Sequence, residues 1–342
     1  MAMARVTIND IAKVAGYSKT SVSFAFNDPG RISEKARDRI LAVADQLGYV
    51  PDPVARTLSL KRHGSIGLLL PEVIPLAFRN SHLSQIVQGI GAVCGTDGHS
   101  LTLIPPLRES VLEGVRSAAV DGLITIGLEP GMEAVHLIRR RHLPFVTIDG
   151  RIGGGFPVVG IDDELAAETI MEHVLSIGHR RIGIVAFSDE PQLQNRSYVK
   201  GRRIAGYHRA LASARPTPIE ESLYFETESS LAGGRLAAEK ILRSPEKPSA
   251  IVAMSDVIAL GILEGLEEQG YTVPDDISLV GFDDIPEAKL VRPQLTTVSQ
   301  PGYDKGHRAA EILMQMIRGE TVDSRYILPT ELIRRDSCAP IV

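Results

Sequence analysis

The sequence predicts an α/β protein whose body consists of two doubly wound lobes and follows a small all-α head. Eight short apolar runs, most of them separated by helical stretches, indicate buried parallel strands in repeated βα units. The runs occupy residues 66–70, 101–104, 122–126, 145–148, 158–161, 182–186, 250–253 and 278–280. Three short helical segments, each preceded by Ser or Thr, fill the first fifty residues and predict the separate head. A chain of 342 residues is long enough for two or three such units.

Two helical segments joined by a glycine open the head. Thr7 with Asp10 three residues later gives the pattern of a capping box, and apolar residues recur at helical spacing up to Gly16. Ser18 can cap a second helix over residues 19–26. The glycine takes the left-handed backbone that a tight turn needs, and small residues beside it let the helices approach closely. This pattern predicts a helix-turn-helix.

The second helix carries mostly polar side chains near its N-terminal end. In a helix-turn-helix this end meets base edges in the major groove, which predicts recognition of double-stranded DNA. Ser33 caps a third helix that Gly48 closes. In the head we expect DNA contacts from Thr7, Lys19, Thr20, Ser21, Ser23, Phe24, Asn27, Ser33 and Tyr49.

A very short helix is predicted between head and body. Asp52 can cap it and Pro53 occupies its first position. About seven helical residues are not stable alone in water, so the segment is expected to order only between DNA and a partner chain.

Together, the runs VTINDIAKVAGYSKTSVSFAFN and ISEKARDRILAVADQLGYVPDPVARTL resemble the LacI/GalR family of bacterial repressors over some sixty residues. The resemblance implies a hinge helix in the DNA minor groove, with Leu58 prying open the central base step and Ala55 and Arg56 beside it. One residue departs from the family, because Phe24 stands where many members carry a guanine-reading arginine. Phe24 can contact a thymine methyl group or pack against the core of the head, and packing is the preferred interpretation.

The same resemblance implies a periplasmic-binding-protein-like body that binds a small effector. We expect a head in residues 1–50, a hinge helix and linker in 51–63, and an effector-binding and dimerisation body in 64–342. The first lobe is expected to combine residues 64–162 with 291–325, and the second 163–290 with 326–342, with crossings near 162, 291 and 325. Residues 72–83 look different from the family, so the first lobe's contribution to the site is poorly defined by the sequence.

Acidic residues follow several predicted strands, and ligands of α/β sheets bind beyond the carboxyl ends of strands. By resemblance, the runs RRIAGYHRAL, VGFDD and VAMSDVIALG place an effector-binding arginine, acid and serine in the body. An arginine fork facing a carboxylate can hold vicinal hydroxyls or a purine edge, so the effector is expected to be a sugar or polyol, with a purine or nucleoside as the alternative. Asp256 is expected to cap a helix. The expected effector-binding residues are Arg203, Asp283, Asp149 and Ser255.

Composition and charge narrow the classes of function. Residues 1–63 hold ten Lys and Arg against six acids, a net charge of +4, which leaves −9 for the rest of the chain. A basic head on an acidic body fits a protein whose head alone meets a polyanion. Cys94 and Cys338 lie in no metal-ligand spacing, so we expect reduced thiols, no metal and no cofactor.

Two rival functions share the predicted body. A solute-binding protein would need a signal peptide and no basic head, but the first residues lack an apolar segment, so we expect a cytoplasmic protein. An enzyme would need a catalytic constellation, and no recognised motif is visible, so we expect no enzymatic activity. The chain after Ile333 is too short for a coiled-coil helix, and a palindromic operator calls for a two-fold partner, so we expect a homodimer.

Overall fold

The computed structural model describes residues 6–52, 62–108, 110–188, 194–214 and 223–341. The chain separates into two compact units, Met1–Gly64 and Ser65–Val342. The expected hinge helix, with Ala55, Arg56 and Leu58, falls in residues 53–61 and lies outside the described residues.

The first unit is a three-helix head, as its caps predict. Its elements are α1 (Ile8–Ala15), α2 (Lys19–Asn27), η1 (Pro29–Arg31) and α3 (Glu34–Gln46). The Thr7 backbone N–H donates to the Asp10 carboxylate at 2.9 Å, and the Ser18 hydroxyl accepts from the Ser21 N–H at 3.0 Å. Gly16 has φ +76° between the first two helices, a conformation that glycine adopts without strain. The core is formed by Ile11, Ala15, Val22, Ala25, Ile40, Val43 and Ala44.

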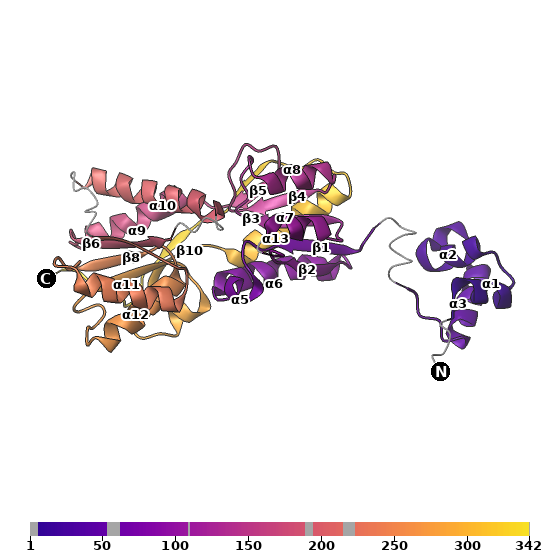
Figure 1. Ribbon diagram of the computed structural model, residues 1–342, viewed down its shortest axis with the longest axis horizontal. Helices are drawn as coiled ribbons and strands as arrows, with labels where there is room; N and C mark the ends of the chain where they lie inside the picture. Colours follow the sequence, from indigo (N-terminus) through magenta and orange to yellow (C-terminus); the bar gives the residue numbers. More distant parts are fainter. Residues whose placement is uncertain (1–5, 53–61, 109, 189–193, 215–222, 342) are drawn as a thin grey trace. The chain divides into compact units, whose positions relative to one another are not determined.

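Two six-stranded sheets form the second unit, one in each lobe (Figure 1). The first has the order β11-β5-β4-β3-β1-β2 and is parallel throughout. The second has the order β12-β10-β9-β8-β6-β7, and only β12 is antiparallel to its neighbour. The first sheet contains β1 (Ser65–Leu69), β2 (Ser100–Ile104), β3 (Gly122–Ile126), β4 (Phe145–Ile148), β5 (Val158–Gly160) and β11 (Arg325–Ile327). The second contains β6 (Ile182–Phe187), β7 (Tyr224–Thr227), β8 (Ala250–Ala253), β9 (Ser278–Asp283), β10 (Thr296–Ser299) and β12 (Glu331–Ile333).

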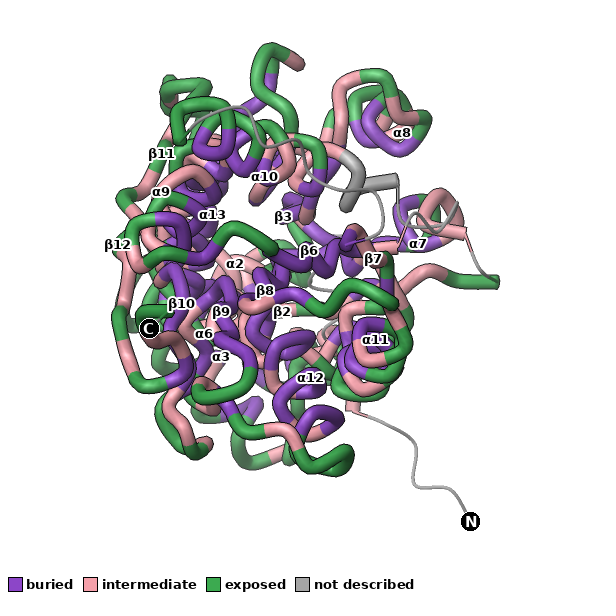
Figure 2. Tube along the Cα trace, turned by 90° about the vertical axis from the view of Figure 1, so that its left-hand side faces the viewer, coloured by how far each residue is buried: buried purple, intermediate pink, exposed green. Residues whose placement is uncertain are grey.

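Helices cover both faces of each sheet, so the central strands are buried on both sides (Figure 2). This is why these strands read as continuous apolar runs. The first lobe carries α5 (Ile74–Ala77), α6 (Ser81–Thr96), α7 (Val111–Ser117), α8 (Glu133–Arg140) and α13 (Gly302–Ile317). The second carries α9 (Asp163–Ser176), α10 (Gln194–Ser213), α11 (Leu231–Arg243), α12 (Asp256–Glu268) and η3 (Pro286–Lys289). None of the helices in the described part of the chain is both long and apolar enough to cross a membrane.

The chain passes between the lobes three times, and two of the passages differ from those expected. The first follows β5, close to the expected residue 162. The second comes after β10, not near residue 291, because β10 pairs with β9 in the second sheet. The sequence of β10 is Thr296-Thr297-Val298-Ser299. Because the buried residues of β10 include two threonines, the strand does not stand out as an apolar run. The third lies between β11 and β12, slightly later than the expected residue 325.

Candidate functional site

The outward face of α2 carries most of the expected DNA-reading side chains. Val22 and Ala25 are buried and mark the inward face of the helix. Around the rest of the helix, side chains remain partly or fully exposed: Lys19, Thr20, Ser21, Ser23, Phe24 and Asn27. The expectation that Phe24 packs into the core is wrong, because its ring lies outside the core cluster that Phe26 joins.

The other expected contacts lie elsewhere on the head. Thr7 and Ser33 are exposed residues that directly precede α1 and α3. The Ser33 hydroxyl caps α3 by accepting from the Ala36 N–H at 3.3 Å. Tyr49 is half-buried with its ring 5.4 Å from that of Phe26, so it also supports the head's packing.

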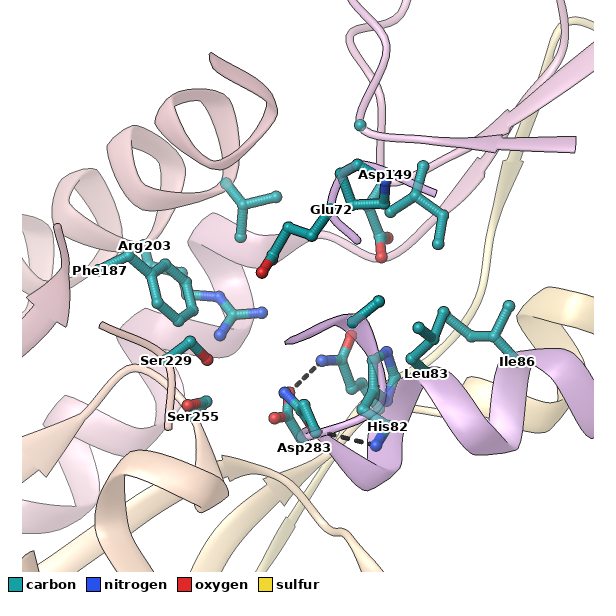
Figure 3. Close-up of a pocket in the computed structure, with 17 residues that line it drawn as sticks. Glu72, His82, Leu83, Ile86, Asp149, Phe187, Arg203, Ser229, Ser255 and Asp283 are labelled. Carbon is teal, nitrogen blue, oxygen red and sulfur yellow. Dashed lines mark hydrogen bonds between the residues drawn. The ribbon is translucent and has the colours of Figure 1, made fainter. Parts of the chain in front are cut away.

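A cleft between the two lobes of the body brings all four expected effector-binding residues together (Figure 3). It measures about 170 Å³, several times the ~30 Å³ that one water occupies in the liquid. Its walls come from the carboxyl ends of strands and the helix starts that follow them, as expected for an open α/β sheet. The lining residues are Pro71, Glu72, Ala77, Asn80, His82, Leu83, Ile86, Ile126, Gly127, Asp149, Phe187, Val199, Arg203, Ser229, Ser255, Asp283 and Gln300.

Arg203 is held rigidly at one side of this cleft. It projects from α10 with only 4% of its surface exposed, and its Nε donates to Asp163 at 2.9 Å. Its Nη1 donates to the carbonyl of Met254, and its guanidinium lies 3.5 Å from the ring centroid of Phe282. These contacts fix the direction of the guanidinium before any ligand arrives. Sequence reasoning missed Asp163, although it is one of three successive acids at the start of α9.

A chain of polar groups along the wall of the cleft connects the two lobes. Lys305 of α13 is fully buried, and its ammonium donates to both carboxylate oxygens of Asp149, at 2.7 and 2.9 Å. The same ammonium donates to Gln300 Oε1 at 2.5 Å, and the Gln300 amide donates to Asp283 Oδ1. Asp149 therefore pairs with Lys305 of its own lobe. Asp283 of the second lobe is linked to the same lysine through the side-chain amide of Gln300.

Two groups in the cleft keep unused hydrogen-bonding capacity. Within the described residues, Asp283 Oδ2 and both ring nitrogens of His82 are buried without a hydrogen-bond partner. Burial raises the pKa of Asp283 to about 6, although Arg203 opposes the shift. Burial also holds the pKa of His82 well below its usual range, which leaves a neutral ring that can donate once and accept once. Buried polar atoms of this kind are costly unless a ligand or water completes them.

Asp283 also has a strained backbone. Its φ is +133°, and Asp284 and Asp149 have φ values of +56° and +53°. Such conformations are uncommon outside glycine and cluster at functional sites. Asp283 ends β9 and Asp149 follows β4, and both residues line the cleft.

The start of α12 corrects one expectation. Ser255, not Asp256, is the cap, since its hydroxyl accepts from the Ile258 N–H. The buried Asp256 carboxylate instead accepts from the Ile285 N–H at 3.0 Å and from the Thr297 hydroxyl at 2.6 Å. It thereby holds the segment after β9 in place.

Residues 72–83, whose course the sequence did not define, reach across to the second lobe. The short helix α5 places Ala77 on the cleft wall. Arg79 forms an ion pair with Glu228 at 3.1 Å, and the Ser81 hydroxyl donates to Glu287 at 2.6 Å. These contacts join the lobes beside the cleft.

Known proteins match both units. The model of the bacterial regulatory proteins of the lacI family matches residues 7–52, and that of the periplasmic binding protein-like domain matches residues 171–338. The transcriptional regulator IpsA of Corynebacterium glutamicum is 32% identical over 358 residues, with 98% of each chain covered. The solved Lac repressor dimer bound to operator and the anti-inducer ONPF has a TM-score of 0.83 at 25% identity, covering 98% of this chain and 100% of that one. The CelR–cellobiose complex has a TM-score of 0.71 at 26% identity, covering 97% of this chain and 100% of that one.

The head, the body and the cleft define a DNA-binding transcription regulator with a ligand-binding sensor domain. Relatives align over nearly the full length of both chains, so the agreement extends well beyond the head. The chain belongs to the lacI family of bacterial regulatory proteins.

Proposed function

We propose that this regulator represses transcription by binding a near-palindromic operator as a dimer, and that a sugar or related polyol in the inter-lobe cleft changes that binding. The observation that carries the proposal is the cleft itself. It combines the rigid guanidinium of Arg203 with two groups whose buried polar atoms have no hydrogen-bond partner, the Oδ2 atom of Asp283 and the ring nitrogens of His82.

A polyol suits this set of partners. A hydroxyl group both donates and accepts, so neighbouring hydroxyls can donate to Asp283 Oδ2 while accepting from Arg203. Phe187 lines the same cleft and offers an apolar face to a sugar ring. The related CelR was solved with cellobiose, which supports this class. A nucleoside is the second candidate, since an arginine and a carboxylate can also hold a purine edge.

A dimer follows from the way the head reads DNA. One helix-turn-helix covers one half-site, so a palindrome needs two copies related by a two-fold axis. Exposed large apolar side chains of the second lobe are Leu231, Leu236 and Leu290. The Lac repressor was solved as a dimer on its operator, which supports the same assembly here. In the proposed dimer of this chain, the Leu58 side chain of each subunit would insert between base pairs at the centre of the operator.

A ligand between the lobes can act on DNA binding only if it prefers one lobe arrangement over another. The contacts of Arg79 and Ser81 across the cleft edge belong to the arrangement seen here. A change in lobe angle would reach the DNA through residues 51–64, which join the first lobe to the head. The coupling free energy is expected to be about 1–3 kcal/mol.

A thermal-shift panel of sugars, polyols and nucleosides tests the proposal, because a ligand that binds only the folded state raises the melting temperature. The ligand found should alter operator affinity of the wild type. Arg203→Ala should bind operator normally without ligand and lose the response to it. Loss of operator binding by a folded Arg203→Ala protein without ligand would assign Arg203 to the scaffold instead.

A further inference from the structure

An aromatic ring lies on α2 outside the core of the head. Helical geometry places Phe24 about 160° around the helix from the buried Val22, about 100° from the buried Ala25, and one turn after Thr20. The ring is only partly buried and takes no part in the core of the head. Its neighbours on this face are polar side chains that we expect to meet DNA.

Arg31 lies over the face of this ring. Its guanidinium carbon lies 5.4 Å from the centroid of the Phe24 ring, within the range of a cation–π contact. Its Nε is 2.9 Å from Asp28 Oδ2, so the guanidinium is tied to the turn that follows α2. The ring is thus in contact with a cation that also pairs with Asp28 at the surface of the head.

We propose that Phe24 reads the C5-methyl group of a thymine in each half-site, with Arg31 as a positioning residue for the ring. The inference rests on the proposed operator binding. A phenyl ring has no hydrogen-bonding group, so it cannot read the donors and acceptors of base edges. The apolar feature that the major groove offers is the thymine methyl.

The first test uses full-length protein and an operator selected from randomised DNA. Each thymine is then replaced by uracil, which lacks only the methyl group. At one symmetric pair of positions, wild-type affinity should fall about fourfold per half-site, as expected for the removal of one buried methyl-sized group. Phe24→Ala should bind the thymine and uracil forms of that pair equally, while melting at the wild-type temperature. Val14→Ala removes another exposed apolar side chain of the head, on α1, and should keep the wild-type discrimination.

Two further variants sharpen the result. Phe24→Arg should shift the preferred base at the same pair to guanine, which arginine reads bidentately. Arg31→Ala should reduce the thymine-to-uracil ratio, and Arg31→Lys should restore it, since both cations can lie against the ring. Loss of the Arg31 charge alone would weaken binding to the thymine and uracil forms of the operator equally, so it would not change the ratio of the two affinities.

The results distinguish base reading by Phe24 from operator binding itself. A wild type that tolerates uracil at every position, or a Phe24→Ala protein that retains discrimination, overturns the role of Phe24. An unchanged ratio in Arg31→Ala overturns the positioning role. Failure to select any DNA sequence would instead overturn operator binding itself.

Discussion

The α2 face of the head and the inter-lobe cleft of the body use similar polar residue types in opposite ways. On α2 the side chains are exposed, and their hydrogen bonds are local, such as Ser18 to Ser21 at 2.9 Å. In the cleft the charged groups are partly or fully buried, and several pair with residues far away in the sequence, such as Lys305 with Asp149.

The difference follows from the two partners. DNA is a large polyanion that presents its base edges in an open groove, so its readers must project into solvent. A small ligand offers few atoms, and its binding is strong only if the protein's groups are already oriented. Substitutions on the head should therefore change binding with little effect on stability, whereas substitutions in the cleft should change both.

The largest effect is expected from Lys305→Met. The variant removes the cation that Asp149 and Gln300 share and leaves a partly buried carboxylate unpaired. The free energy of unfolding should fall by about 3–5 kcal/mol, measured by urea denaturation. Adding Asp149→Asn should recover part of this loss. A loss below about 1 kcal/mol in the single variant would show that the buried pair does not hold the cleft together.

Asp283→Asn should separate stability from ligand binding. The pKa of Asp283 in the folded protein is about 6, above its ordinary value near 4. The protonated carboxyl therefore stabilises the folded wild type at low pH, and this stabilisation is lost as the pH rises from about 4 to about 6. The variant cannot ionise and should be more stable than the wild type by about 1–3 kcal/mol at pH 8, with a smaller gain at pH 5. It should also lose the effector-induced thermal shift, because an amide replaces one acceptor oxygen. Equal gains at both pH values would contradict the assigned ionisation.

Substitutions of Ser33 test whether a change on the head alters operator binding without altering stability. Ser33→Asp and Ser33→Asn both retain a cap for α3, so melting of the head should change little. If Ser33 faces a phosphate, the new charge of Ser33→Asp should weaken operator binding about tenfold at low salt relative to Ser33→Asn. The measurement is a binding titration at two salt concentrations. Equal affinities of the two variants would limit Ser33 to capping.

The smallest effect on stability is expected at the edge of the cleft. Arg79 and Glu228 are each about half exposed, so Arg79→Ala should lower the free energy of unfolding by less than about 1 kcal/mol. A double-mutant cycle with Glu228→Gln measures the pair directly. A coupling as large as that of the buried Lys305 pair would remove the contrast between exposed and buried charges.

Local signals predicted the head and most strands. Caps and glycines act within a few residues, and Thr7, Ser18 and Ser33 each precede the expected helix. Eight strands across the two lobes, β1 to β6 with β8 and β9, were found as apolar runs, whereas β7, β11 and β12 were not predicted. The threonine-rich β10 lacked that signal, so the second passage between lobes was expected too early.

The cleft was predicted in part, because its contacts are not local. Arg203 and Asp283 could be inferred from resemblance, but their partners could not. Lys305 lies 156 residues from Asp149, and a lysine in a helical pattern normally indicates a solvated face. Phe24 shows the opposite error, since packing against the core of the head was the preferred interpretation and the structure keeps its partly buried ring outside that core.

The three passages between the lobes have a consequence for how such proteins can be recombined. The second lobe is largely inserted within the first, so no single cut in the body's gene separates two complete lobes. The head joins the body through one stretch of chain near Gly64, so a single recombination event can exchange it whole. New combinations of DNA target and ligand should therefore arise by exchanging entire heads, whereas new ligand specificity must come from substitutions within an intact body.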